Sequence, residues 1–422
     1  MKTSDLILFS LFTVFLISCS SSKNQNENTT AERAAAVKEK ENTFFTIDFA
    51  EIIKDQKEVP LSEIAESVKY IQLENSDKAL LGNVFDVQLT PEYIFIKHSG
   101  SRLLAQFSCN GEFIRNIGTE GRGPKEYGLI RKFSLDQENR LIYIHTNWTH
   151  KVIVFNFDGE FVRSLRFPTS GRGSISWSRD SFLVSFSEPE MGNEPYTFIE
   201  TNFNGDTIQT VNNHIFWGEN DQTHFMVSYW GRNVYYRTND KLHMKSWYND
   251  TVYTFSNENK IVPAFFIDLK HHKLPNDQVY ERKSTKPLPE ECYWVGVNES
   301  SKYIFIRYGD QYDKLKKNRK GKANGCVYFD KLTKKGTALK RKEDANGFIN
   351  DINGGPQFLP RFSNDSLIFV EVSALDMKTF LESDEFKNRE VKSPAQKEVL
   401  TKIKKDLKED DNHILMLAKL NE

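Results

Sequence analysis

The stretch FDVQLTPEYIFI, residues 85–96, decides the fold, because its pattern returns five more times along the chain. In this stretch one strand leads through a tight polar turn into a short run of aromatic and β-branched residues. The second strand of the unit begins at residues 93, 141, 182, 234, 303 and 367, so the copies lie 41 to 69 residues apart. Such a repeat, with insertions of variable length, is typical of four-stranded propeller blades.

Each of the first five copies continues with a third strand that ends at a turn. Three of these turns are Asn110-Gly111, Asp158-Gly159 and Asn204-Gly205, which supply the positive φ that short hairpins need. A fourth strand such as GEFIRNIG, residues 111–118, comes after the turn. The strand order a, b, c, d therefore repeats along the chain.

The sixth copy lacks a fourth strand at its own end of the chain. After Leu367 to Val370 come a long charged stretch and a third strand, His413 to Leu420, with no strand behind it. Phe44 to Phe49 is the expected donor, because an N-terminal strand paired into the last blade closes the ring and removes open edges. We therefore predict an all-β fold, one six-bladed β-propeller over residues 43–421. A tandem of β-sandwiches, or a seven-bladed ring that uses Lys57 to Glu74, are the alternatives.

The amino-acid composition is typical of a water-soluble chain with enough hydrophobic residues to form a core. The 422 residues carry 57 Lys and Arg against 58 Asp and Glu, a formal net charge of -1, and 38% are hydrophobic. The mean hydropathy of −0.56 excludes a polytopic membrane protein, and the charge balance disfavours a nucleic-acid binder. The basic loop Lys314 to Lys322 has no interleaved aromatics and is read as a solvated loop. Three cysteines without metal-site or disulfide spacing are read as free thiols: Cys109, Cys292 and Cys326.

The N-terminus predicts export and a lipid anchor. The apolar run Leu6 to Ile17 is too short to cross a bilayer and fits the core of a signal peptide. Leu16-Ile-Ser-Cys19 resembles a bacterial lipobox. We expect residues 1–18 to be a lipoprotein signal peptide, Cys19 to be lipidated, and residues 19–42 to form a polar tether. A plain secretory peptide or an uncleaved anchor are the alternatives.

Three stretches carry a family resemblance: residues 60–74, 118–127 and 406–420. They resemble the six-bladed β-propeller lipoproteins of Bacteroidetes, which are related in fold to NHL and TolB-type propellers. His413 departs from the family, where Pro is expected. The resemblance implies a lipoprotein of the outer membrane, on its periplasmic or its surface side, that accompanies uptake systems for glycans and other nutrients.

Loop lengths point to one working face. In a propeller the b–c and d–a connections lie on one face, called here the loop face, and the a–b and c–d turns on the other, the turn face. The long insertions at residues 187–196, 309–324 and 371–412 all belong to the loop face. Function concentrates on loops held by a rigid scaffold, so we expect the site there. The last insertion, about 378–411, has helical spacing with a start at Ser393-Pro394, and we expect a small helical cap over this face.

The candidate binding residues are Arg122, Glu126, Tyr127 and Arg172. Both arginines lie in Gly-Arg-Gly links between blades, where exposed backbone N–H groups and forked guanidinium donors suit a carboxylate, phosphate or sulfate. The alternative is that these links only turn the chain and that the arginines pair with Glu120 or Glu126.

No nucleophile, phosphate-binding or dinucleotide motif appears, and no cofactor is expected. His98 and His145 end two b strands but lack metal-site spacing, so no metal is expected. We predict a monomeric, non-catalytic protein that binds a glycan, a peptide or a protein partner in the envelope. The alternative is a propeller lyase or hydrolase that acts on a glycan or peptide in the funnel with Glu188 and Glu190 or a His-bound metal.

Overall fold

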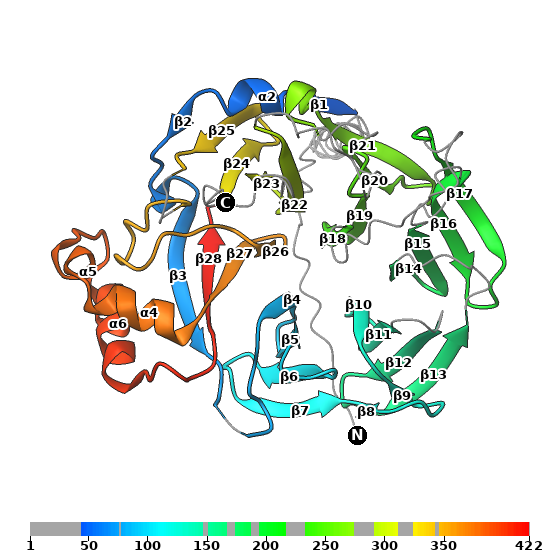
Figure 1. Ribbon diagram of the computed structural model, residues 1–422, viewed down its shortest axis with the longest axis horizontal. Coiled ribbons are helices and arrows are strands. Elements are labelled where there is room, and N and C mark those ends of the chain that lie inside the picture. Colours follow the sequence, from blue (N-terminus) through cyan, green and yellow to red (C-terminus); the bar gives the residue numbers. More distant parts are fainter. Residues whose placement is uncertain are drawn as a thin grey trace, which may run out of the picture. The chain divides into compact units, whose positions relative to one another are not determined.

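Six small sheets, the blades, surround a common axis in the computed structural model (Figure 1). The described residues are 44–75, 77–146, 151–166, 174–186, 194–216, 233–273, 291–310, 324–341 and 346–421. The predicted signal peptide (1–18), Cys19 and the tether to residue 42 lie outside them. The arrangement confirms the six-bladed β-propeller and excludes the tandem of sandwiches.

Blades one to three follow the predicted order, with strand a innermost and strand d outermost. Blade one holds β4 (Val84–Leu89), β5 (Tyr93–His98), β6 (Leu104–Ser108) and β7 (Phe113–Ile117). Blade two holds β10 (Ile130–Asp136), β11 (Leu141–Thr146), β12 (Lys151–Asn156) and β13 (Phe161–Arg166), after the short pair β8 (Thr119–Glu120) and β9 (Glu126–Tyr127). Blade three holds β14 (Ile175–Arg179), β15 (Phe182–Phe186), β16 (Tyr196–Asn202) and β17 (Thr207–Asn212).

Blades four and five each gain a fifth, parallel strand at the outer edge. Blade four holds β18 (Val234–Thr238), β19 (Lys241–Lys245), β20 (Thr251–Phe255), β21 (Ile261–Ile267) and the added β1 (Phe45–Ile47). Blade five holds β22 (Tyr293–Glu299), β23 (Tyr303–Asp310), β24 (Gly325–Asp330), β25 (Lys335–Leu339) and the added β2 (Gln56–Lys57). Blade six holds β26 (Phe362–Ser363), β27 (Leu367–Val372), β28 (Ile414–Leu420) and β3 (Ala65–Gln72).

The predicted strand assignment of blade four is wrong by one strand. Val234 to Tyr236 belongs to the inner strand a, and strand b is Lys241–Lys245. The two strands meet at Asn239-Asp240, whose φ angles of 48° and 60° define a two-residue hairpin turn. This Asn-Asp turn follows the Val-Tyr-Tyr run instead of preceding it. The run is therefore strand a of its blade and not strand b.

An N-terminal strand does close the ring, but the predicted donor is wrong. The outer strand of blade six is β3 (Ala65–Gln72), which pairs antiparallel with β28. Phe44 to Phe49 instead supplies β1, where the Phe45 ring stacks on Phe265 and Phe329. The seven-bladed alternative also fails, because residues 57–74 are divided between blades five and six.

The N-terminal segment covers the outer edges of successive blades before it closes the last one (Figure 1). After β1 the chain forms α2 (Phe49–Ile52), then β2 on blade five and the 3-10 turn η1 (Leu61–Glu63). An uncovered edge would offer free N–H and C=O groups to another chain. This path therefore protects the edges of blades four and five.

The insertion of blade six is helical, as predicted: α4 (Ala374–Glu382), α5 (Asp384–Asn388) and α6 (Pro394–Asp406). Ser393 caps α6 and Pro394 occupies its first turn. Leu381, Leu400 and Ile403 pack into the cluster that includes residues of β3 and blade five. The helices lie outside β3 (Figure 1), so the expected cap over the loop face is wrong; their apolar sides cover the outside of the closing strand.

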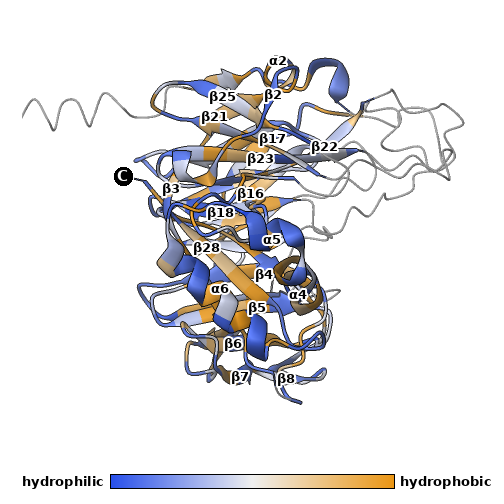
Figure 2. Ribbon diagram, turned by 90° about the vertical axis from the view of Figure 1, so that its left-hand side faces the viewer, coloured by the Kyte–Doolittle hydropathy of each residue, from blue (hydrophilic) through white to orange (hydrophobic). Residues whose placement is uncertain are grey.

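Hydropathy follows this layout (Figure 2), with hydrophobic residues along β28 and largely hydrophilic ones on α5 and α6.

Polar contacts also join the inner strands of neighbouring blades. For example, Gln88 of blade one donates to the Phe133 carbonyl of blade two (3.0 Å), and Arg361 of blade six donates to the Val84 carbonyl of blade one (2.8 Å). Among the described residues, no helix is long and apolar enough to cross a membrane.

Candidate functional site: the loop face

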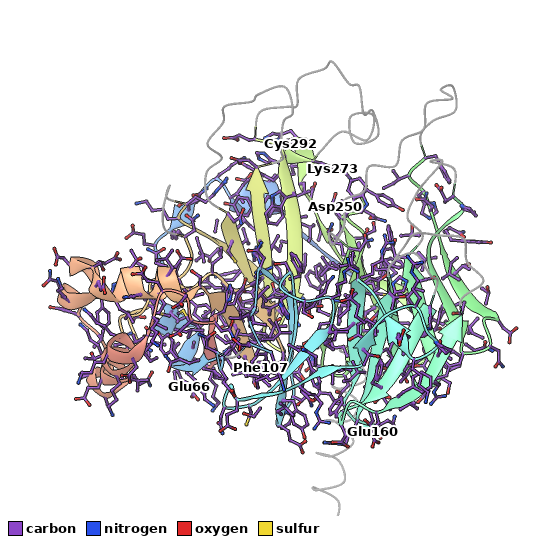
Figure 3. All side chains as sticks on the ribbon, turned by 60° about the horizontal axis from the view of Figure 1, so that its bottom comes forward. Glu66, Phe107, Glu160, Asp250, Lys273 and Cys292 are labelled. Carbon is purple, nitrogen blue, oxygen red and sulfur yellow. The ribbon has the colours of Figure 1, made fainter. Side chains whose placement is uncertain are left out.

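Figure 3 shows both faces of the ring through labelled residues. Asp250, Lys273 and Cys292 lie toward one side and belong to the b–c and d–a connections, hence to the loop face. Glu66 and Glu160 lie toward the other side, at the turn face.

The turn face is tied together near the axis. Asp365, in the a–b turn of blade six, accepts hydrogen bonds from Thr238 Oγ1 (3.1 Å) and Asn239 N (2.7 Å) of blade four. Ser301, in the same turn of blade five, donates to Asn239 Oδ1 (2.8 Å). Three inner turns are therefore held against one another at this end.

The loop around Arg122 is ordered by groups other than Arg122. Glu126 Oε2 accepts from Gly123 N (2.9 Å), and Glu120 pairs with Arg102 at 2.7 Å. Lys151 Nζ donates to the Pro124 carbonyl (2.8 Å). Arg122 is exposed, and no ion pair joins it to a described residue. The pairing of Arg122 with Glu120 or Glu126 that the sequence allowed is thus not found, and its binding role stays a prediction.

Tyr127 is a packing residue. It is only 2% exposed, and its hydroxyl donates to the Ile117 carbonyl and accepts from Leu104 N (3.1 Å). Its ring packs edge-on against Phe155. Burial raises the pKa of this phenol, so it stays neutral. We assign Tyr127 to the junction of blades one and two.

The other predicted site residues, Arg172, Glu188 and Glu190, lie outside the described residues. The same holds for most of the insertions at 187–196 and 309–324. The structure thus brings together Glu126 and Tyr127 of the predicted set, in one short link.

A pattern that the sequence reasoning missed lies at the loop-face end of the b strands. The fifth residue of this strand is ionisable in five of the six blades. The six residues, in blade order, are Lys97, His145, Phe186, Lys245, Arg307 and Glu371. We call them the fifth-position ring. Most of the ionisable members follow an apolar run, as in YIFIK and YIFIR, and that change from apolar to charged is the available sequence signal.

The ammonium group of Lys97, in blade one, has a hydrogen-bond partner in blade two. Its Nζ donates to the Arg131 carbonyl (2.8 Å), and the neighbouring Lys132 pairs with Asp86 at 2.9 Å. Burial lowers the pKa of Lys97 to about 8, with repulsion from Lys132 and Arg131 adding to the shift and Asp86 opposing it.

His145 accepts a hydrogen bond instead of donating one: its Nδ1 accepts from the backbone N–H of Ile175, at 3.1 Å. The neighbour of Lys97, His98, likewise accepts from Gly100 N (3.1 Å), and burial lowers its pKa to about 4. A neutral histidine in this role serves as a fixed acceptor. The described part of the chain holds no group of three His, Cys, Asp or Glu side chains able to bind a metal.

Lys245 and Glu371 have charged partners. Lys245 is 1% exposed and lies 3.3 Å from Asp250, which also pairs with Lys273 at 2.9 Å. Burial lowers the pKa of Lys245, and the Asp250 carboxylate opposes the shift. Glu371 forms an ion pair with Arg361. Burial, with repulsion from Arg307, lowers the pKa of Arg361 to about 10.

Arg307 is the exception in the ring. No hydrogen bond or ion pair joins its guanidinium to any described residue, and its Nε is shielded from solvent without a partner. Burial lowers its pKa. The residue opposite on strand c, Cys326, is no counter-ion, because burial raises the pKa of that thiol to about 12. The loop face therefore holds a partly buried cation that the described protein leaves unneutralised.

The fold and this geometry can be compared with known proteins. A family model described as "Domain of unknown function (DUF4934)" matches residues 44–419. The chain belongs to the DUF4934 family. The match spans all six blades of this DUF4934 protein, including the N-terminal segment that closes the ring.

Two solved structures share the fold of this DUF4934 chain at low identity. A Bacteroides fragilis protein described as exported is 19% identical with a TM-score of 0.64, covering 90% of this chain and 100% of that one. A DUF4221 family member from Bacteroides vulgatus is 12% identical with a TM-score of 0.50, covering 87% and 99%. At these identities the likeness shows the fold alone. No curated protein matches the chain.

Proposed function

We propose that this protein is exported, anchored by a lipid on Cys19, and binds a ligand or a partner through its loop face without catalysis. The observation that carries the proposal is the contrast between the two faces. The a–b turns of blades four to six bond to one another at the turn face. The loop-face ends of the b strands instead carry the fifth-position ring, with a cation, Arg307, that has no counter-ion among the described residues.

Two further observations support export and anchoring. Leu16-Ile-Ser-Cys19 follows an apolar run of signal-peptide length, and the similar Bacteroides fragilis protein is described as exported. Replacing Cys19 by Ala should move the protein from the membrane fraction to the soluble fraction of the envelope. Equal membrane association of both forms would contradict the lipid anchor.

The binding role is tested with residues 20–422 against glycan and peptide arrays, followed by calorimetry on the hits. A ligand in the envelope, such as an acidic glycan taken up by the cell, fits a face at which the cation of Arg307 has no counter-ion among the described residues. Each hit is also incubated with the protein and examined for products. Saturable binding without product supports the proposal, whereas turnover would favour a lyase or hydrolase, and no binding would contradict it.

A further inference from the structure

We infer that Arg307, together with Arg361, forms a binding site for one oxyanion group of the ligand: a carboxylate, a sulfate or a phosphate. This inference rests on the proposed function and names the chemistry that the loop face recognises. It begins from a comparison within the molecule, since all members of the fifth-position ring occupy equivalent strand positions.

The partners of the other ionisable ring members are internal. Lys97 donates to a carbonyl of blade two, His145 accepts from a backbone N–H of blade three, Lys245 lies beside Asp250, and Glu371 pairs with Arg361. Arg307 has no such partner among the described residues. A buried guanidinium without an anion is costly, and five donors in a planar fork suit an oxyanion.

The inner strand leaves room beside Arg307. Its partner on β22 is Gly296, and paired residues of antiparallel strands project from the same side of the sheet. A Cβ built on Gly296 would meet one atom within 4 Å, Trp294 Cζ3 at 3.8 Å. Among the described residues, only the edge of the Trp294 ring therefore comes within 4 Å of the position beside Arg307 where a Gly296 side chain would begin.

Arg361 makes the site more cationic. It directly precedes the inner strand of blade six, and repulsion from the Arg307 charge helps to lower its pKa. Glu371 neutralises one of the two positive charges, and Glu371 Oε2 has no hydrogen-bond partner. One positive charge is left over, which matches a single bound anion. A ligand anion would relieve the repulsion between the two guanidinium groups.

The test is calorimetric titration of residues 20–422 with sodium sulfate, phosphate and glucuronate at an ionic strength held constant with sodium chloride. We expect a one-site isotherm of roughly millimolar affinity for at least one of these ions. Arg307→Gln should weaken it at least tenfold, the scale for loss of a charge-assisted hydrogen bond, and Arg307→Lys by less. Arg102→Gln is the matched control, because Arg102 is exposed on the same face, already pairs with Glu120 and should leave the affinity unchanged.

A second variant keeps the charge of Arg307 and places a side chain beside it on the inner strand. Gly296→Leu should reduce the affinity for the same ion at least tenfold while Arg307 is intact. Thermal melting without anion separates binding from folding: Arg307→Gln should melt at or above the wild-type temperature, because it removes a partly buried charge that no described residue neutralises.

Two results would overturn the inference. One is an absence of saturable binding of all three ions to the wild-type chain. The other is equal affinity in wild type and Arg307→Gln. If the arrays yield a neutral ligand that Arg307→Gln binds as well as wild type does, the proposed function stands and the oxyanion site falls.

Discussion

Cysteines placed at Ser67 and Lys419 should form a disulfide bond that fixes the last blade shut. The two residues are direct partners in the β3–β28 ladder, and opposite residues of antiparallel strands lie roughly 4.5–5.5 Å apart at Cα, within the range that a disulfide spans. The bond would close a loop of roughly 350 residues, for which the chain-entropy model gives about 5–6 kcal/mol as an upper bound. Engineered bonds deliver less, so we expect about 2–4 kcal/mol.

The assay compares oxidised and reduced protein in a Cys109→Ser background, since Cys292 and Cys326 are buried. Peptide mapping identifies the bond, and denaturant unfolding gives the difference in free energy. The control joins Thr46→Cys to Lys419→Cys, the closure expected if Phe44 to Phe49 supplied the last strand. The reasoning would be refuted if the control pair cross-linked and the Ser67 pair did not.

Three further predictions concern groups other than Arg307 and Arg361. Burial lowers the pKa of His98 to about 4 in the folded protein. As the pH falls below about 6.5, this histidine is therefore protonated in the unfolded chain before it is protonated in the folded one. Its contribution to the free energy of unfolding is fully present above about pH 6.5 and is lost as the pH falls toward about 4. His98→Gln should therefore lose about 2 kcal/mol less stability than wild type between pH 7.5 and 5, measured by urea unfolding. Tyr127→Phe should cost about 1–3 kcal/mol, because Leu104 N loses its acceptor, while anion binding in calorimetry stays unchanged. Ile403→Ala should cost about 2–5 kcal/mol in thermal unfolding and the exposed Val399→Ala less than about 0.5; equal effects would mean that α6 does not pack as described.

Local sequence patterns predict the blades because the residues of each hairpin turn can be recognised in the sequence. Gly111, Gly159 and Gly205 have φ values of 94°, 80° and 92°, as the Asn-Gly and Asp-Gly pairs indicate. The Asn239-Asp240 turn carried the same information for blade four, and the assignment there failed because that turn was not recognised.

The closing strand was harder, since propensity does not say which distant edge a strand joins. Phe44 to Phe49 and Ala65–Gln72 both read as strands. The choice depends on where the Phe45 ring stacks and on the apolar side of β3 that faces the core. Neither contact is local in the sequence.

The predicted site residues differ in how the structure places them. Arg122 and Tyr127 share one link, yet one is exposed and the other is buried under hydrogen bonds. Arg307 looked like the end of an ordinary strand. That no described residue pairs with its guanidinium is a tertiary property, because it depends on Gly296 opposite and on the residues of the next blade.

The most direct test of the account follows the Nε–H group of Arg307 by NMR in protein labelled with [15N]arginine. This group is shielded from solvent, so its proton should exchange slowly enough to be observed, and its signal is identified by its loss in Arg307→Gln. Titration with the ion that binds in calorimetry should shift this signal along a curve with the same dissociation constant, while the signal of Arg179, whose Nε is also shielded and which pairs with Glu200, stays in place. An Arg307 signal that does not move when the ion binds would contradict the claim that the loop face recognises its ligand through this residue.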